Sequence, residues 1–445
     1  MKPNILIITI DSLRADKIYG NDKSSLTPNI DSLIKKGIYF TQAISTSDAT
    51  GLSLGSIFTA SYPFKTGITH FNYNPDTSTY FQILKDQGYH TFATVPDVSF
   101  FLKLTSNLTD KDAYVYDKRD SWIQLVGGIG QLIIDRLERK LEEPWMYFIH
   151  LMDLHAPFYL PKEFDSEKYG KTRYDRMVSA IDFWIGKFLE KIDLTKTLVI
   201  ISADHGDYIP ILDKQPKGQT KLHTLLKKGK ETIPSLEPLG LKLFIAFNSL
   251  KKSYKYNKLK KNLTEDQLRT LDARGQWHLY DELIRIPLIF IGQGILSSKI
   301  ISEQVRQVDI FPTIIDILKI SGLRNTVNGQ SLVPLFVGKS LEEIPAYIET
   351  GSRDPKKLGN IIGIRTPKYK YLRSRIDPTQ NISLFDLQND PLEQNNLAPS
   401  KPEIVKEMEN LLNEIKIDSI NQDLPEFDDE ETKNIQEELK KLGYL

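Results

Sequence analysis

Carboxylate and imidazole side chains stand within or just after three short apolar runs of the sequence, NILIITI, WMYFIHL and TLVIISA. They are Asp11 after the first run, His150, Asp153 and His155 in and after the second, and Asp204 and His205 after the third. Asp and His together suit a divalent metal ion such as Zn or Mn. One Asp behind a strand can equally cap the next helix, but three runs that end in this way favour a metal site.

A hydroxyl that such an ion could activate belongs to Thr50, just before the apolar helix start LSLGSIF. Backbone N–H groups and the helix dipole at a helix N-terminus favour an anion. A hydroxyl bound to a divalent metal loses its proton more easily and becomes a nucleophile. On the local sequence alone, the simpler interpretation is that Thr50 only caps the helix.

The elements that must position these residues alternate between strand and helix. Five apolar runs are typical of buried parallel strands; they are Asn4–Ile10, Tyr89–Val95, Trp145–Leu151, Thr197–Ala203 and Ile286–Gly292. Helical patterns occupy 29–36, 53–58, 79–87, 174–191 and 308–320. The alternation predicts an α/β fold with a doubly wound, mainly parallel sheet and helices on both faces. Such sheets bind ligands beyond the carboxyl ends of their strands, where the acids and histidines would meet.

The pattern changes near residue 346. The segments IIGIRTPKYKYLRSR and ISLFDL predict antiparallel strands, and Pro402–Lys416 and Glu430–Leu442 predict two helices. We therefore expect a catalytic α/β domain over 1–345 and a small α+β C-terminal subdomain over 346–445.

A long segment at about 208–276 lacks the core pattern and is predicted to be an insertion. Its part 238–262 is apolar and then rich in Lys. The preferred interpretation is a solvated helical cap over the edge of the site. The alternative is a weak contact with an anionic membrane surface, as interfacial amphipathic helices make.

The composition excludes several classes of function. Lys and Arg number 58, as do Asp and Glu, so no net positive charge attracts a nucleic acid, and we expect no such partner. The absence of Cys excludes disulfides and thiolate sites. The N-terminal apolar run is too short for a secretion signal or a membrane span, so we expect a cytoplasmic protein. The sequence does not indicate an oligomeric state.

Successive segments along nearly the whole chain resemble the landmarks of one family. They are NILIITIDSLRAD, TPNIDSLIKKGIYFTQA, SIFTASYPFKTGI, ISADHGD, LYDELIRIPLIFIG, VDIFPTIIDIL, GQSLVPLF, GIRTPKYKYL and LFDLQNDPLEQNNLA. In content and order they resemble the sulfatase family of the alkaline-phosphatase superfamily. This resemblance implies an alkaline-phosphatase-like α/β domain with a small C-terminal subdomain.

The resemblance also assigns the nucleophile. In the family, it lies nine residues before the Thr of an L-T-G-x-Y-P-like segment, here FTASYP with Thr59, which gives Thr50. Sulfatases have Cys or Ser there, oxidised to formylglycine. Threonine cannot yield that aldehyde because its carbinol carbon bears a methyl, so we expect no formylglycine. A threonine there resembles the superfamily's nucleotide pyrophosphatases, lipoteichoic-acid synthases and phosphopentomutases, which act on phosphate esters.

Two groups of site residues follow from the resemblance. A first metal ion, with Zn or Mn favoured and Ca or Mg as alternatives, would be held by Asp11, Thr50, Asp204 and His205. A second group would contact the substrate anion or leaving group, with catalytic roles for His155 and His278; its members are His150, Asp153, His155 and His278. The alternative for this group is a second metal ion, and His150 is explained equally well as a buried strand residue.

These assignments predict a metal-dependent hydrolase that cleaves phosphate mono- or diesters through a covalent Thr50 intermediate. The substrate would be a small-molecule, glycan or lipid ester. One alternative is a sulfuric ester hydrolase acting on a sulfated small molecule or glycan. The others are a phosphotransferase and a non-catalytic binder of anionic polymers.

Overall fold

The computed structural model describes residues 2–69, 79–114, 116–117, 121–122, 125–139, 141–155, 159–209, 279–320, 327–352, 359–417 and 437. Met1–Tyr208 and Trp277–Leu445 form one compact unit, and Ile209–Gln276 form another. Almost all of the predicted insertion, including 238–262, lies outside the described residues, as do His278 and the predicted helix Glu430–Leu442 apart from residue 437.

A nine-stranded sheet forms the centre of the first unit, in the order β10-β2-β9-β8-β1-β7-β3-β4, with β11 also paired to β2. The strands are β1 (Asn4–Ile10), β2 (Ile38–Ile44), β3 (His90–Pro96), β4 (Asp110–Tyr114), β7 (Trp145–Leu151), β8 (Thr197–Ala203), β9 (Arg285–Gly292), β10 (Lys299–Ile301) and β11 (Val305–Arg306). Every residue of β1, β7 and β8 is buried, as the continuous apolar runs predict for strands covered on both faces. The mostly parallel α/β sheet is therefore confirmed.

One predicted strand direction is wrong. The run Ile286–Gly292 is expected to be parallel, but β9 is antiparallel to both β2 and β8. The short helix before it, α11 (Asp281–Ile284), lies at the carboxyl end of β8, because Gly206 N–H donates to the Leu283 carbonyl at 2.7 Å. β9 therefore starts at this edge of the sheet and runs back, antiparallel to β8.

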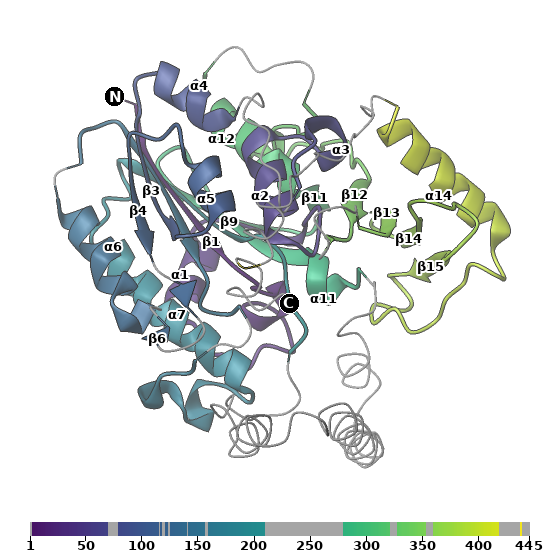
Figure 1. Ribbon diagram of the computed structural model, residues 1–445, viewed down its shortest axis with the longest axis horizontal. Coiled ribbons are helices and arrows are strands. Elements are labelled where there is room, and N and C mark those ends of the chain that lie inside the picture. Colours follow the sequence, from purple (N-terminus) through teal and green to yellow (C-terminus); the bar gives the residue numbers. More distant parts are fainter. Residues whose placement is uncertain are drawn as a thin grey trace, which may run out of the picture. The chain divides into compact units, whose positions relative to one another are not determined.

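Helices lie on both faces of the sheet (Figure 1). On one side α1 (Pro28–Lys36) and α6 (Ile129–Glu138) contact α7 (Arg173–Leu189), and on the other α4 (Tyr80–Asp86) and α12 (Ile310–Ile317) contact α2 (Thr50–Thr59). Shorter elements connect them: α3 (Pro63–Thr66), α5 (Ser99–Leu104), α13 (Val333–Phe336) and the two-stranded β5 (Tyr116–Asp117) and β6 (Ser121–Trp122). Of the described residues, none belongs to a helix that is both long and apolar enough to cross a membrane.

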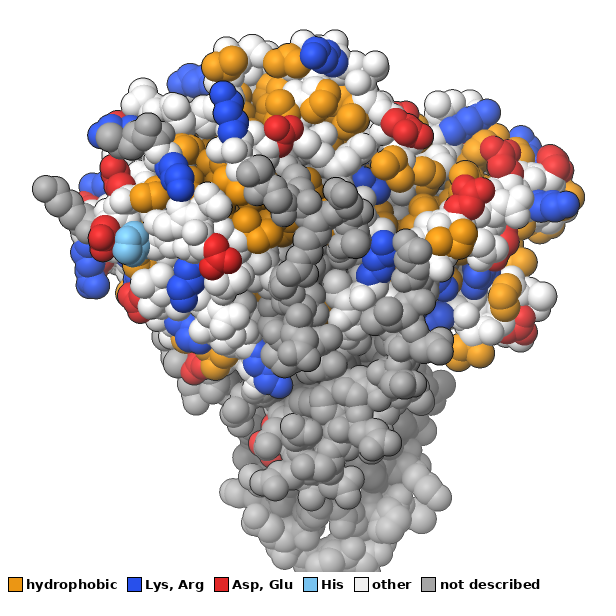
Figure 2. Space-filling model, turned by 90° about the horizontal axis from the view of Figure 1, so that it is seen from above, with side chains coloured by type: hydrophobic (Ala, Val, Ile, Leu, Met, Phe, Trp, Pro, Cys, Tyr) orange, Lys and Arg blue, Asp and Glu red, His pale blue; other side chains and the backbone are white. Residues whose placement is uncertain are grey.

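A separate antiparallel sheet follows, as predicted for the C-terminal part of the chain. It consists of β12 (Ala346–Glu349), β13 (Ile361–Arg365), β14 (Tyr369–Ser374) and β15 (Ser383–Asp386). Helix α14 (Pro402–Ile415) contributes Met408 and Leu412 to a buried cluster that also contains Tyr62 and Val308 of the larger part. On the face in Figure 2, basic and acidic side chains are both scattered over the described surface, in keeping with the formal net charge of zero.

Candidate active site

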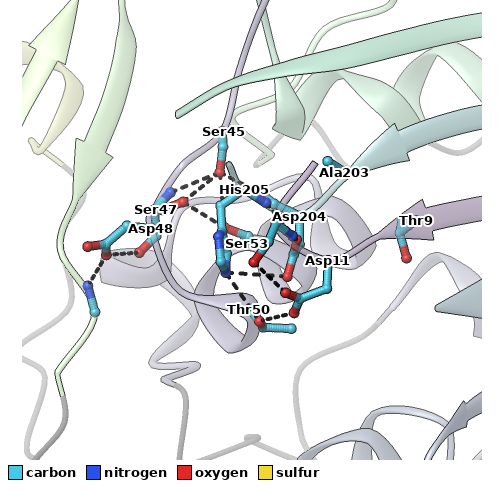
Figure 3. A network of polar contacts seen from close by, with 12 residues as sticks. Thr9, Asp11, Ser45, Ser47, Asp48, Thr50, Ser53, Ala203, Asp204 and His205 are labelled. Atoms are coloured by element: carbon cyan, nitrogen blue, oxygen red, sulfur yellow. Dashed lines mark hydrogen bonds and ion pairs between the residues drawn. The ribbon is translucent and has the colours of Figure 1, made fainter. Parts of the chain in front are cut away.

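Four residues predicted from the sequence come together at the carboxyl ends of neighbouring strands (Figure 3). In the parallel pairing of β1 with β8, Ile10 is opposite Ala203, so Asp11 and Asp204 leave the sheet side by side. Both carboxylates are fully buried. His205 follows Asp204 directly, and Thr50 is the first residue of α2.

The Thr50 hydroxyl faces this cluster. Its Oγ1 donates to Asp11 Oδ2 at 3.1 Å and lies 3.3 Å from His205 Nε2. Helix α2 begins three residues earlier than the predicted 53–58, and its N-cap is Ala49, which makes no side-chain capping bond. Thr50 is therefore not the helix cap, and its hydroxyl lies at the N-terminus of a ten-residue helix, where an anion is favoured.

Ser12 links the two carboxylates, a role that the sequence does not reveal. Its hydroxyl donates to Asp11 Oδ1 at 2.6 Å, and its backbone N–H donates to Asp204 Oδ1 at 3.1 Å. Ser12 has a φ of 63°, in the left-handed region, which non-glycine residues seldom occupy. The Tyr174 hydroxyl, which donates to the Ser12 carbonyl, helps to hold this backbone. Such strain is common where backbone geometry serves a site.

The residues fit a bound cation. Asp11, Asp204 and His205 each offer one ligand atom, and these atoms lie within 4.8 Å of one another. Asp204 Oδ2 is buried and has no hydrogen-bond partner, although His205 Nε2 is 3.5 Å away. An unpaired buried carboxylate oxygen is costly. A divalent ion at this point would remove that cost.

The pKa shifts have the same origin. Burial, and then the charge of Asp11, raises the pKa of Asp204. Burial alone would lower the pKa of His205, but Asp204 and Asp11 raise it to about 9. For Asp11, burial would raise the pKa, but His155, His150 and His205 together lower it well below its usual range. The titrations of the two carboxylates and of His205 are therefore set by burial and by the charges of one another.

The second predicted group is only partly described. His150 is fully buried in β7; its Nδ1 lies 2.8 Å from Thr9 Oγ1, and its Nε2 has no hydrogen-bond partner and lies 3.8 Å from Asp11 Oδ2. Asp153 accepts a hydrogen bond from Leu125 N–H at 3.1 Å, and burial raises its pKa to about 7. Within the described ranges, these residues form no further metal-ligand cluster. The roles of His155 and of His278, which is not described, stay predictions.

The comparisons with known proteins decide the family. Residues 3–320 match the family model described as Sulfatase. The chain belongs to the sulfatase family. Residues 271–418 of this sulfatase-family hydrolase also match the model described as N-sulphoglucosamine sulphohydrolase, C-terminal. The resemblance seen in the sequence is therefore confirmed at the level of the family.

Relatives of this sulfatase-family chain match it over most of its length. Arylsulfatase K of Gallus gallus is 23% identical over 454 residues, which cover 93% of this chain and 82% of the relative. The choline-sulfatase of Rhizobium meliloti is 24% identical, with 89% and 82% covered.

Two solved structures share the fold of this sulfatase-family chain. A 2-O GAG sulfatase has a TM-score of 0.64 at 18% identity, with 94% of this chain and 93% of that chain covered. The phosphonate monoester hydrolase of Agrobacterium radiobacter has a TM-score of 0.67 at 15% identity, with 94% and 96% covered. At these identities, the likeness establishes the alkaline-phosphatase-like fold alone.

Proposed function

We propose that this protein hydrolyses an anionic ester with Thr50 as the nucleophile. The observation that carries the proposal is the Thr50 hydroxyl at the N-terminus of α2, in hydrogen-bond contact with Asp11 and 3.3 Å from His205. A divalent ion held by Asp11, Thr50, Asp204 and His205 would lower the pKa of the hydroxyl and offset charge on the substrate oxygens. Two carboxylates with an imidazole favour Zn or Mn over Ca or Mg.

The residues of the chain account for each bond that changes. The Thr50 hydroxyl loses its proton to solvent, its oxygen attacks the sulfur or phosphorus of the ester in line with the leaving alcohol, and the bond from that atom to the ester oxygen breaks. His155 or His278 gives the proton that the leaving oxygen needs. Water then attacks the same sulfur or phosphorus of the Thr50 adduct and gives a proton to that histidine. The bond to Thr50 breaks, Thr50 regains a proton from solvent, and the inorganic anion, or the phosphate monoester in the case of a diester, is released. The backbone N–H groups of the first turn of α2 favour the negative charge throughout.

A sulfuric ester is the first candidate substrate. The relatives that match most of the chain are named arylsulfatase K and choline-sulfatase. This supports the sulfatase alternative of the sequence analysis more than its phosphate-ester prediction. Relatives of both names point to a small sulfated molecule or glycan rather than to a polymer bound without turnover.

A phosphate ester is the second candidate, favoured by one specific residue. A formylglycine hydrate has a second hydroxyl that expels sulfate without attack at sulfur, whereas Thr50 has only one. The Thr50 adduct must therefore be opened by external water, a step that reverses the first one and is common for phosphate.

A cytoplasmic location and a membrane contact of 238–262 also stay predictions.

Rapid quenching tests the proposal and separates the two candidates. Wild type is mixed with sulfate esters or phosphate mono- and diesters labelled with ³⁵S or ³²P, with Mn, Zn, Ca or Mg added, and the labelled peptide is sequenced. Label on Thr50 is expected from one substrate class. Thr50→Ala should lower kcat by at least about 1,000-fold, because the nucleophile is lost, while Thr50→Ser should keep part of it. Unchanged turnover in Thr50→Ala, with no label on the Thr50 peptide, contradicts the proposal.

A further inference from the structure

The strand that precedes the nucleophile and the strand that precedes two of the proposed metal ligands are not neighbours in the sheet. The loop 45–49 follows β2, Asp204 and His205 follow β8, and β9 lies between these two strands. Main-chain pairing between β2 and β8 therefore cannot set the distance from Thr50 to Asp204 and His205. Another contact has to do so.

Gln307 spans this gap. Its Nε2 donates to the carbonyls of Asp204 at 2.8 Å and Ala203 at 3.1 Å, and its Oε1 accepts from Thr46 N–H at 3.3 Å. Only this orientation of the amide matches a donor to both carbonyls and an acceptor to the N–H. The side chain is fully buried. One amide thus joins the end of β8 to the loop that leads into α2.

The backbone brings Gln307 to this place. β11 runs parallel to the end of β2, with Arg306 opposite Ile44, so the next residue of each segment lies beside the other. Gln307 begins the short 3-10 turn Gln307–Asp309, and Arg306 and Asp309 form a buried ion pair with Nη2 and Oδ1 2.6 Å apart. The amide is therefore held on a rigid support.

Ser45 forms a second link of the same kind. Its Oγ lies 2.7 Å from the Asp204 carbonyl and 3.0 Å from Ser53 Oγ in the first turn of α2 (Figure 3). The carbonyl of Asp204 therefore contacts both Gln307 and Ser45. Together they tie the peptide that precedes His205 to both sides of Thr50.

We propose that Gln307 is a positioning residue that sets the spacing between the Thr50 hydroxyl and the metal ligands Asp204 and His205. The inference deepens the proposed function and rests on it. Outer partners of metal ligands typically change metal affinity or activity by 10- to 100-fold when they are removed. A displacement of about 1 Å between reacting groups can lower a rate by about 100-fold.

The test compares two buried glutamines. Gln307→Met removes the bridging amide and puts an apolar side chain of similar length in its place. Gln304→Met is the matched control: Gln304 is also buried and donates to a carbonyl, that of Arg365 at 2.9 Å, but it faces the C-terminal sheet and not the site. For both variants and wild type, the melting temperature, the Kd for Mn²⁺ or Zn²⁺ without substrate, kcat and KM are measured.

Both variants are expected to melt at a lower temperature than wild type. Only Gln307→Met should raise the Kd for the metal ion by about 10- to 100-fold and lower kcat by at least about 10-fold. KM should change less than kcat, because the reacting atoms are displaced and the substrate surface is not. Gln304→Met should keep the metal Kd and kcat within about twofold of wild type. Equal changes in the two variants overturn the proposal, as does a wild-type metal Kd together with a wild-type kcat in Gln307→Met.

Gln307→Asn provides the measurement if Gln307→Met does not fold. It keeps the donor and the acceptor but is one methylene shorter, so it reaches only one side of the gap, and it should fall between wild type and Gln307→Met. The metal Kd separates the two proposals. A wild type that binds metal but hydrolyses no ester refutes the proposed function, while a weaker metal Kd in the Gln307 variants still supports the positioning role.

Discussion

Two groups of mainly buried charges in this molecule differ in how their charges are paired. The first is the site group, Asp11, Asp204 and His205. The second, called here the anchor cluster, consists of Asp281, Arg365, Lys370 and Glu393, where α11 meets the C-terminal sheet. All of these side chains are buried except that of Asp281, which is 17% exposed, so each charge in them needs a partner.

Each acid of the anchor cluster has a cationic partner within the chain. Lys370 Nζ, fully buried, lies 2.7 Å from both Asp281 Oδ1 and Glu393 Oε1 and donates to the Leu279 carbonyl at 2.9 Å. Arg365 donates to both oxygens of Asp281, at 3.0 and 2.8 Å. Two acids thus face two bases. Burial alone would raise the pKa of Asp281, but Arg365 and Lys370 lower it well below its usual range.

The site group lacks such balance. The cationic group nearest to Asp204 Oδ2 is His205 Nε2 at 3.5 Å, whereas Lys370 Nζ lies 2.7 Å from Glu393 Oε1. The difference between the groups therefore lies in what completes them. The anchor cluster uses its own cations, whereas under the proposed function a divalent ion completes the site group.

The largest expected effect follows from removing one acid of the site group. Asp204→Asn should weaken divalent-metal binding by at least about 100-fold, since it removes a ligand and not only an outer partner. Activity should fall in parallel. Without metal, the variant should melt no lower than wild type, because a buried carboxylate with one oxygen that accepts no hydrogen bond has been replaced by a neutral amide. Calorimetric titration with Mn²⁺ or Zn²⁺ and thermal melting measure these quantities. Full metal occupancy and intact activity in Asp204→Asn would refute the assignment of the site.

The corresponding change in the anchor cluster should act on stability. Lys370→Met leaves Asp281 and Glu393 with fewer cationic partners in a buried place and should lower the free energy of unfolding by about 3 to 5 kcal/mol. The urea midpoint measures the loss. Lys368→Met is the control, because Lys368 is exposed two residues away and should cost no more than about 0.5 kcal/mol. If the two lysine variants lose equal stability, the anchor cluster is not the paired structure described above.

The sequence predicts the site group better than the anchor cluster, for a physical reason. Asp11, Asp204 and His205 follow continuous apolar runs, and parallel strands of one sheet end at the same edge. Their convergence therefore follows from local pattern plus one rule of topology. The direction of β9 does not follow from the local pattern, because the run Ile286–Gly292 would be buried equally well in either direction.

The partners of the anchor cluster are far apart along the chain and leave no local signal. Asp281 stands in a four-residue helix, and Lys370 lies on a short strand 89 positions later, since 370 − 281 = 89. Gln307 is hidden in a similar way, because its partners Thr46 and Asp204 belong to segments predicted separately. Periodicity indicates which side chains are buried, but it does not indicate which of them meet.

The smallest expected effect concerns a proton in the anchor cluster. Burial, and then the charge of Asp281, raises the pKa of Glu393 to about 7, although Lys370 partly offsets the shift. A carboxyl whose pKa is higher in the folded than in the unfolded chain stabilises the fold fully below its unfolded pKa. That contribution is lost as the pH rises through the folded pKa. Between about pH 4.5 and pH 7, the free energy of unfolding should therefore fall because of Glu393, by at most about 3 kcal/mol.

Glu393→Gln isolates this contribution, because the amide cannot titrate. Urea midpoints of wild type and variant are measured without added metal at about pH 5, 6, 7 and 8, and their difference removes the titration of the site group, which both proteins share. The advantage of wild type over Glu393→Gln should shrink as the pH rises. Glu407→Gln, at an exposed position of α14, should stay parallel to wild type throughout. A constant difference between wild type and Glu393→Gln would mean that Glu393 keeps one protonation state over this range, and that the anchor cluster is balanced without its proton.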